Sequence, residues 1–164
     1  MKQVYRFLLI LFLLPLCMSG QETSGFFEKI KGEWKGEGNL FGTEASFYMN
    51  WKTELEGKFM TLDFKNKFKT GEGTVREMKA KAFYTLKEEV KGYWLDSRGV
   101  MLPLKGNRQA DKMLIYWGDD GSTEKGKTEY SIVSDNKVEV KDYVFRDEKY
   151  VPFGHAVYQK LEKE

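Results

Sequence analysis

The single histidine is the residue of this sequence with the clearest potential for chemistry. His155 lies in the last strand candidate, where its neighbours at a spacing of two, Val151, Phe153, Val157 and Leu161, are apolar. This alternation predicts that the imidazole points into the interior, where a neutral ring could ligate an iron atom. A lone histidine on an apolar face is also commonly a core residue whose ring nitrogens are hydrogen-bonded within the protein. The residues alone leave both interpretations open.

Other polar groups are explained more simply as turns than as catalytic or metal sites. Asp96-Ser97-Arg98 places an acid beside a hydroxyl, but it ends a strand candidate and precedes Gly99, as turn residues do. With one histidine, the spacing offers no Ser-His-Asp set, and the sequence has no Gly-x-Ser-x-Gly elbow. The acidic run 119–124 lacks the alternate spacing of a calcium loop. The sequence therefore favours a binding protein, and catalysis is the less supported interpretation.

The first residues predict a signal for export. Lys2 and Arg6 precede an unbroken apolar run, 7–16, and small residues follow it. The run is too short to be a permanent membrane anchor. We therefore expect residues 1–20 to be a cleaved signal peptide and residues 21–164 to form the mature domain, in the periplasm or secreted.

The only cysteine raises an alternative to simple cleavage. Cys17 lies just after the apolar run, where a cysteine can be lipidated and tether the protein to a membrane. A lipoprotein signal resembles an apolar pair followed by a small residue directly before the cysteine, and Leu16 is not small. Either outcome leaves the folded domain without a disulfide, and zinc would need clustered Cys and His that this domain lacks.

The charge balance of the mature domain excludes one large class of partners. Removing residues 1–20 takes away two basic residues and no acid, so that 25 basic residues remain against 25 acidic ones. A neutral domain with interspersed Lys and Glu lacks the positive field on which non-specific nucleic-acid binding depends. We therefore expect neither nucleic acid nor an acidic membrane to be a partner.

The rest of the chain predicts one small β-domain behind a short helix. Apolar residues at helical spacing predict a helix over 24–31, and beyond it the period changes to two. The strand candidates are 33–41, 45–54, 58–68, 74–85, 90–96, 100–104, 112–117, 123–133, 137–146 and 151–161. No long helix separates them, which excludes a parallel sheet. We predict an all-β fold, a single antiparallel up-and-down β-barrel of about ten strands, closed so that no strand edge is exposed.

A barrel of this size is roughly wide enough to hold one small molecule. We expect the bound molecule to be apolar or amphipathic and to be held mainly by apolar burial. Alternation predicts these lining residues: Trp51, Met60, Leu62, Phe64, Met113, Ile115, Trp117, Phe153, His155 and Val157. A third interpretation is a scaffold or interaction module whose barrel is filled by its own side chains.

Several short motifs resemble known barrel families. Gly32-Glu33-Trp34 at the start of the first strand, after a short helix, resembles lipocalin-like and fatty-acid-binding barrels, with Trp34 closing the base. The segments 55–59, 93–97 and 157–160 resemble a bacterial lipocalin-like family of uncharacterised function. This resemblance implies a ligand-binding barrel over most of residues 26–163. Pro103, within a strand candidate, departs from a regular strand.

A second, weaker resemblance is to nitrobindin-type haem barrels. They also begin with a Gly-x-Trp-x-Gly-x-Gly motif, here residues 32–38, and end with a strand that carries one haem-ligating histidine. This resemblance implies haem as a cofactor, with His155 as the axial ligand of its iron. The offsets of Ala156 and Leu161 differ from those of that family's final strand. The leading hypothesis is therefore a small-molecule carrier without a cofactor, and the alternative is a haem protein.

Overall fold

The structure, a computed structural model, describes residues 25–162 as a nearly all-β domain with one short helix. The fold class predicted from the sequence is confirmed. The elements are α1 (Phe26–Ile30), β1 (Gly32–Leu40), β2 (Thr43–Glu54), β3 (Phe59–Lys69), β4 (Val75–Thr85), β5 (Glu89–Asp96), β6 (Met101–Arg108), β7 (Lys112–Trp117), β8 (Gly126–Ser134), β9 (Lys137–Arg146) and β10 (Lys149–Lys160).

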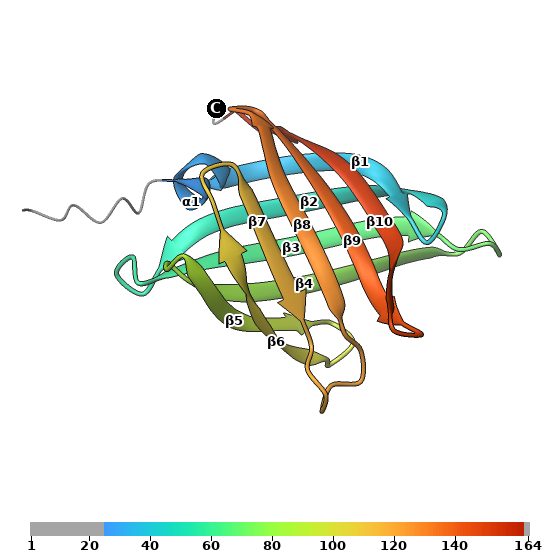
Figure 1. The fold of residues 1–164 in the computed structure, drawn as a ribbon. Helices are drawn as coiled ribbons and strands as arrows, with labels where there is room; N and C mark the ends of the chain where they lie inside the picture. Colours follow the sequence, from blue (N-terminus) through green and yellow to red (C-terminus); the bar gives the residue numbers. More distant parts are fainter. Residues whose placement is uncertain (1–24, 163–164) are drawn as a thin grey trace, which may run out of the picture.

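The ten strands form a closed antiparallel barrel in which each strand pairs with its neighbours in the chain. The barrel closes where β1 pairs with β10, in a register that places Gly36 opposite Tyr158. Figure 1 shows the strands wrapping around a common axis, with β1 and β10 side by side. Closure leaves no unpaired sheet edge, which removes the usual route to edge-to-edge aggregation.

Away from the register shifts in β8 and β10, alternate residues of each strand face the interior, as the sequence pattern predicts. On β2, Phe47, Met49 and Trp51 are buried, whereas Tyr48 and Asn50 between them are half-buried and Ser46 and Lys52 on either side are exposed. A large inward side chain needs a small residue beside it on the adjacent strand. Gly36 supplies one such place, because a Cβ there would lie 2.6 Å from the ring of Tyr158.

The helix α1 covers one end of the barrel. Phe26, Phe27 and Ile30 on its inner face are buried, and Phe27 contacts Trp51 and Tyr84 inside the barrel. Figure 1 shows α1 beside the beginning of β1, at the end where β2 finishes. This end, called the packed end below, is filled by aromatic side chains.

Trp34 completes the packed end. Its side chain is fully buried, and its Nε1 donates a hydrogen bond of 2.7 Å to the carbonyl of Ile30 at the end of the helix. The Nζ atom of Lys160 lies 5.0 Å from its ring centroid, at a distance typical of a cation–π contact. The sequence interpretation that Trp34 closes the base of the barrel agrees with this position.

The predicted strand boundaries hold with local differences. β7 and β9 match the predicted ranges, whereas β6 runs on to Arg108, four residues past the predicted end at Leu104. Pro103 is paired with Tyr93, and its carbonyl accepts a hydrogen bond from the amide of Gly118. A proline lacks only the donor of the pair, so the strand continues through it.

The predicted signal peptide, residues 1–20, and Cys17 lie outside the described residues. Within residues 25–162, no helix combines the length and the apolar character that a membrane span requires. The same part of the chain contains no group of three or more His, Cys, Asp or Glu side chains arranged to hold a metal ion.

Candidate functional site

The end of the barrel opposite α1, called the open end below, has an accessible inner face. No helix of the described residues covers it. Near this end, side chains at inward positions are only half-buried. They include Phe64, Ala80, Trp94, Trp117, Thr128, Asp142 and Val144. An inward side chain that keeps accessible surface is reached by solvent, which makes the open end the candidate entrance to the barrel.

The most unusual residue on this inner face is Asp142 of β9. Its register partners are Thr128 on β8 and Gly154 on β10, both at inward positions. The hydroxyl of Thr128 donates a hydrogen bond of 2.6 Å to Oδ1 of Asp142. Gly154 leaves room beside the carboxylate, since a Cβ there would lie 3.1 Å from Oδ2 of Asp142. The sequence and the pairing thus set one carboxylate among apolar inner-wall residues.

Burial raises the pKa of Asp142 to about 6, because the barrel wall disfavours the charged form, and the Thr128 hydrogen bond lowers it only in part. Three tyrosines of the packed end lie close enough to be affected by this carboxylate. The pKa values of Tyr84, Tyr130 and Tyr158 are raised chiefly by burial, and the negative charge of Asp142 adds to the rise. Asp142 therefore lies at the boundary between the packed aromatic end and the open end.

Two further polar atoms on the inner face have no hydrogen-bond partner among the described residues. They are Nε1 of Trp51, a donor, and Oδ1 of Asn66, an acceptor, and both residues are buried. Buried polar atoms in folded proteins usually have a partner. Together with Asp142, they give the apolar interior a small number of polar groups, which is the composition of a ligand site.

The wall around the open end is held by a network of charged side chains at the β5–β6 turn. Arg98 lies between Asp96, at 2.6 Å, and Glu124 of the β7–β8 loop, at 2.5 Å. Nε1 of Trp94 donates to Oδ2 of Asp96 at 3.1 Å. The amide of Arg98 also donates to Asp96 at 2.8 Å, as the sequence interpretation of this segment as a turn requires. These contacts link two loops of the open end and position Trp94 on the inner wall.

Aromatic residues surround the same end. Phe41 stacks on Phe153 with ring centroids 5.1 Å apart, and its other neighbour is Phe68 at 5.9 Å. Trp117 meets Phe153 edge to face at 6.4 Å. Phe41 is 62% exposed, so an apolar surface continues from the rim to the solvent.

The structure divides the predicted lining residues into three sets. Phe64, Trp117 and Phe153 lie at the open end and are half-buried. Five others face inward but are fully buried in the core toward the packed end, so that they shape the floor of the space: Trp51, Met60, Leu62, Met113 and Ile115. The remaining two, His155 and Val157, are on the outer face of β10.

The expected inward orientation of His155 and Val157 is therefore wrong, and a β-bulge is the reason. Pro152 pairs with Tyr143 and Gly154 with Asp142, so Phe153 is an extra residue in β10. One extra residue shifts the alternation by one, which turns every later side chain to the other face. Gly154, Ala156 and Tyr158 face inward instead.

On the outer face, His155 has an ordinary surface partner. Its Nε2 lies 2.9 Å from Oε1 of Glu139, and its side chain is 45% exposed. The hydrogen bond from His155, followed by that from Lys141, holds the pKa of Glu139 below its usual range. An imidazole in this position does not fit the axial ligation of a haem inside the barrel, since the ring and the interior lie on opposite sides of the wall.

Sequence reasoning missed Asp142, Thr128 and Asn66. A signal for Asp142 was present, because it interrupts the inward apolar positions Val138, Val140 and Val144 at the same spacing. An acidic side chain that faces a protein interior rarely lacks a partner. The pairing with Thr128 depends on the register of β8, which the sequence alone does not fix.

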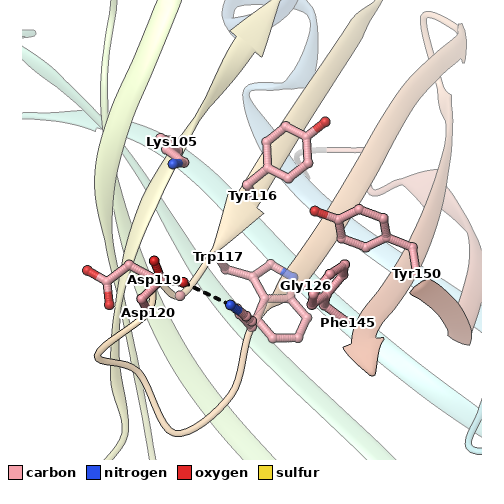
Figure 2. A pocket seen from close by; sticks show the side chains of 10 residues that line it. Lys105, Tyr116, Trp117, Asp119, Asp120, Gly126, Phe145 and Tyr150 are labelled. Atoms are coloured by element: carbon pink, nitrogen blue, oxygen red, sulfur yellow. Dashed lines mark hydrogen bonds and ion pairs between the residues drawn. The ribbon is translucent and has the colours of Figure 1, made fainter. Parts of the chain in front are cut away.

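A second concave surface lies mainly on the outside of the barrel, although Trp117 and Gly126 of the inner wall also line it. Figure 2 shows this outer groove between the β7–β8 loop and the aromatic side chains of Tyr116, Phe145 and Tyr150. Its volume is about 390 Å³. Lys125 in the groove pairs with Asp120 at 3.0 Å and lies 5.4 Å from the ring of Phe145. These contacts account for the charge of Lys125 without a ligand.

Comparison with known proteins supports the fold and goes no further. No protein-family model matches the sequence, and none of the curated proteins matches it. Among solved structures, the chain is similar to an S-type phycobiliprotein lyase from Guillardia theta, with a TM-score of 0.56 and 12% identity. The match covers 84% of this chain and 91% of that chain. At this identity the likeness shows the fold alone, a closed antiparallel β-barrel.

Proposed function

We propose that this protein binds a small apolar or amphipathic molecule inside the barrel, through the open end. One observation carries the proposal. Inward residues at this end keep accessible surface, whereas those of the packed end are buried against α1. The likeness in fold to a phycobiliprotein lyase is consistent with small-molecule binding.

The composition of the inner wall indicates how such a molecule would be held. Phe64 and Trp94 lie with ring centroids 5.5 Å apart, and they provide apolar area at the open end. Burial of apolar surface contributes about 25 cal/mol per Å², so a molecule of modest size would gain several kcal/mol from this wall. The few inward polar groups would then fix its orientation.

The location of binding can be tested with an uncharged fluorescent probe and a pair of matched variants. N-phenyl-1-naphthylamine should bind the wild-type protein with a saturable rise in fluorescence at one probe per chain. Ala80→Trp would fill the inner face of β4 at the open end and should abolish the rise, whereas Lys79→Trp, on the exposed outer face of the same strand, should retain it. Circular dichroism would verify that both variants fold. Binding that survives Ala80→Trp, or no saturable binding at all, would overturn the proposal.

We also propose that the protein acts outside the cytoplasm, because residues 1–20 have the features of a cleaved export signal. Mass spectrometry of the protein purified from its own host should give a mature chain that begins near residue 21. A chain that retains residues 1–20 would contradict export by this route, and a lipid mass on Cys17 would identify the anchored alternative.

A further inference from the structure

The fold provides few interactions that offset the cost of burying the carboxylate of Asp142. None of the ion pairs within residues 25–162 includes it, and its single side-chain hydrogen bond comes from Thr128. A carboxylate has room for about four hydrogen bonds. Burying a charge without a partner is costly, and wall positions of this kind normally carry apolar residues. The presence of an acid at this position is explained if a bound molecule supplies its partner.

The charged groups at other inward positions do not supply that partner. Asp96 pairs with Arg98 in the wall of the open end. The guanidinium of Arg108 donates to the carbonyls of residues 86 and 87 and lies over the ring of Phe27 at the packed end. Lys160 lies over the ring of Trp34, and Arg76, Arg146 and Lys149 are exposed at the open end. The remaining titratable neighbours of Asp142 are the neutral tyrosines 84, 130 and 158.

Asp142 is at an inward position of β9, and no side chain of the described residues donates a hydrogen bond to its Oδ2 atom. Gly154 presents no side chain beside it, and Thr128 occupies only one of its oxygens. The inner wall toward the rim includes the aromatic side chains of Trp94 and Trp117. Aromatic faces favour cations and exclude anions, which adds to the selectivity of the carboxylate.

We propose that Asp142 binds a positively charged nitrogen, so that the ligand of the barrel is an amphipathic amine. Its ammonium group lies at Asp142, and its apolar body extends along the aromatic wall toward the open end. This inference rests on the proposed function and adds the chemical class of the ligand. An anionic amphiphile such as a fatty acid would place a second negative charge beside Asp142 and is disfavoured.

Three ligands of equal chain length separate the contribution of the charge from that of the apolar body. Isothermal titration at pH 7.5 would compare decylamine, decanol and decanoate on the wild-type protein. We expect decylamine to bind about tenfold or more tightly than decanol, since a charged hydrogen bond contributes ~1.5–3 kcal/mol, and decanoate to bind most weakly.

Two variants and a control assign the preference to the carboxylate. Asp142→Asn should remove the preference for decylamine while it leaves decanol binding within about twofold. Thr128→Val retains the carboxylate and should retain the preference. Asp63→Asn changes a carboxylate on the outer face, paired with Lys52 and Lys81, and should change nothing.

The outcomes distinguish this inference from the proposed function. Equal binding of decylamine and decanol by the wild-type protein, or a preference that survives Asp142→Asn, would overturn the amine assignment and leave the barrel as a site for apolar ligands. Failure of all three ligands to bind, together with failure of the uncharged naphthylamine probe, would overturn the proposed function as well.

Discussion

The hydroxyl of Thr128 donates a hydrogen bond of 2.6 Å to Asp142, its partner across the β8–β9 ladder, on the inner face of the barrel. This is a polar contact within a wall whose other inward residues are mostly apolar. Because it satisfies one oxygen and leaves the other free, it holds the carboxylate in place without neutralising it. The position of Asp142 thus connects the stability of the barrel to the binding of the proposed ligand.

Asp142→Asn should stabilise the protein at pH 8 and have little effect at pH 4. Burial raises the pKa of Asp142 to about 6, against 3.8 for an ordinary aspartate, so the folded state binds this proton more tightly than the unfolded chain does. Stability therefore falls as the pH rises from about 4 through about 6, by on the order of 1–3 kcal/mol at a half-buried site. Thermal melts at both pH values would measure this. The same difference in Tm at pH 4 and pH 8 would contradict it.

The binding of a cationic ligand should depend on pH in the opposite sense. Protonation of Asp142 below about pH 6 removes the charge that the ammonium contacts, so decylamine should bind about tenfold more weakly at pH 5 than at pH 7.5. Decanol carries no charge and serves as the control. Equal losses for both ligands would indicate a general change in the barrel and would refute the role of Asp142.

Asp96→Asn should destabilise the open end. Burial acts to raise the pKa of Asp96, but hydrogen bonds from Arg98 and Trp94 outweigh it and hold the pKa below its usual value of 3.8. This stabilisation is present above about pH 4 and is lost as the pH falls through the lower pKa of the folded state. We expect a loss of about 2 kcal/mol at pH 7, measured by urea unfolding. A difference that persists undiminished at pH 2.5 would argue against the charge as its cause.

Gly36→Ala should be among the most damaging single changes to the barrel seam. The new Cβ would lie 2.6 Å from the ring of Tyr158, and that ring is buried and cannot move freely. Overpacking of this kind typically costs about 1–3 kcal/mol. Gly71→Ala is the matched control, since a Cβ there meets nothing within 4 Å. Equal midpoints of urea unfolding for the two variants would show that β1 and β10 pack differently at the seam.

His155→Ala should leave ligand binding unchanged and alter stability by no more than about 0.5 kcal/mol, because its contact with Glu139 is on the surface. Hemin added to the wild-type protein should give no sharp Soret band that depends on His155. Such a band, abolished by His155→Ala, would show that the imidazole reaches a haem and that its outward orientation is not retained in solution.

Most of the architecture followed from local signals in the sequence. The turn at Glu56-Gly57 contains residues with positive φ, and glycine tolerates that conformation without strain. The alternation on β2 identified its buried face directly, because each strand has one wet and one dry side. With antiparallel hairpins throughout, closure was the expected way to protect the edges.

The site could be predicted only in part, because alternation fails wherever a strand has an extra residue. Pro152 and Gly154 flank the bulge at Phe153, and these two residues were the available hint that the face of β10 would change. Without the bulge, His155 would have been an interior residue. The alternation of side chains also could not predict how far the barrel interior is filled. That depends on how Trp51 packs with Tyr84 and Tyr130.

In the proposed function, the interior of the open end, and not the outer groove, receives the small molecule. The most direct test is to record the amide NMR spectrum of the isotope-labelled protein while N-phenyl-1-naphthylamine is added. We expect the amides of Thr128, Asp142 and Val144 to shift and those of Tyr116 and Tyr150, which line the outer groove, to stay in place. Shifts confined to the outer groove would contradict the account.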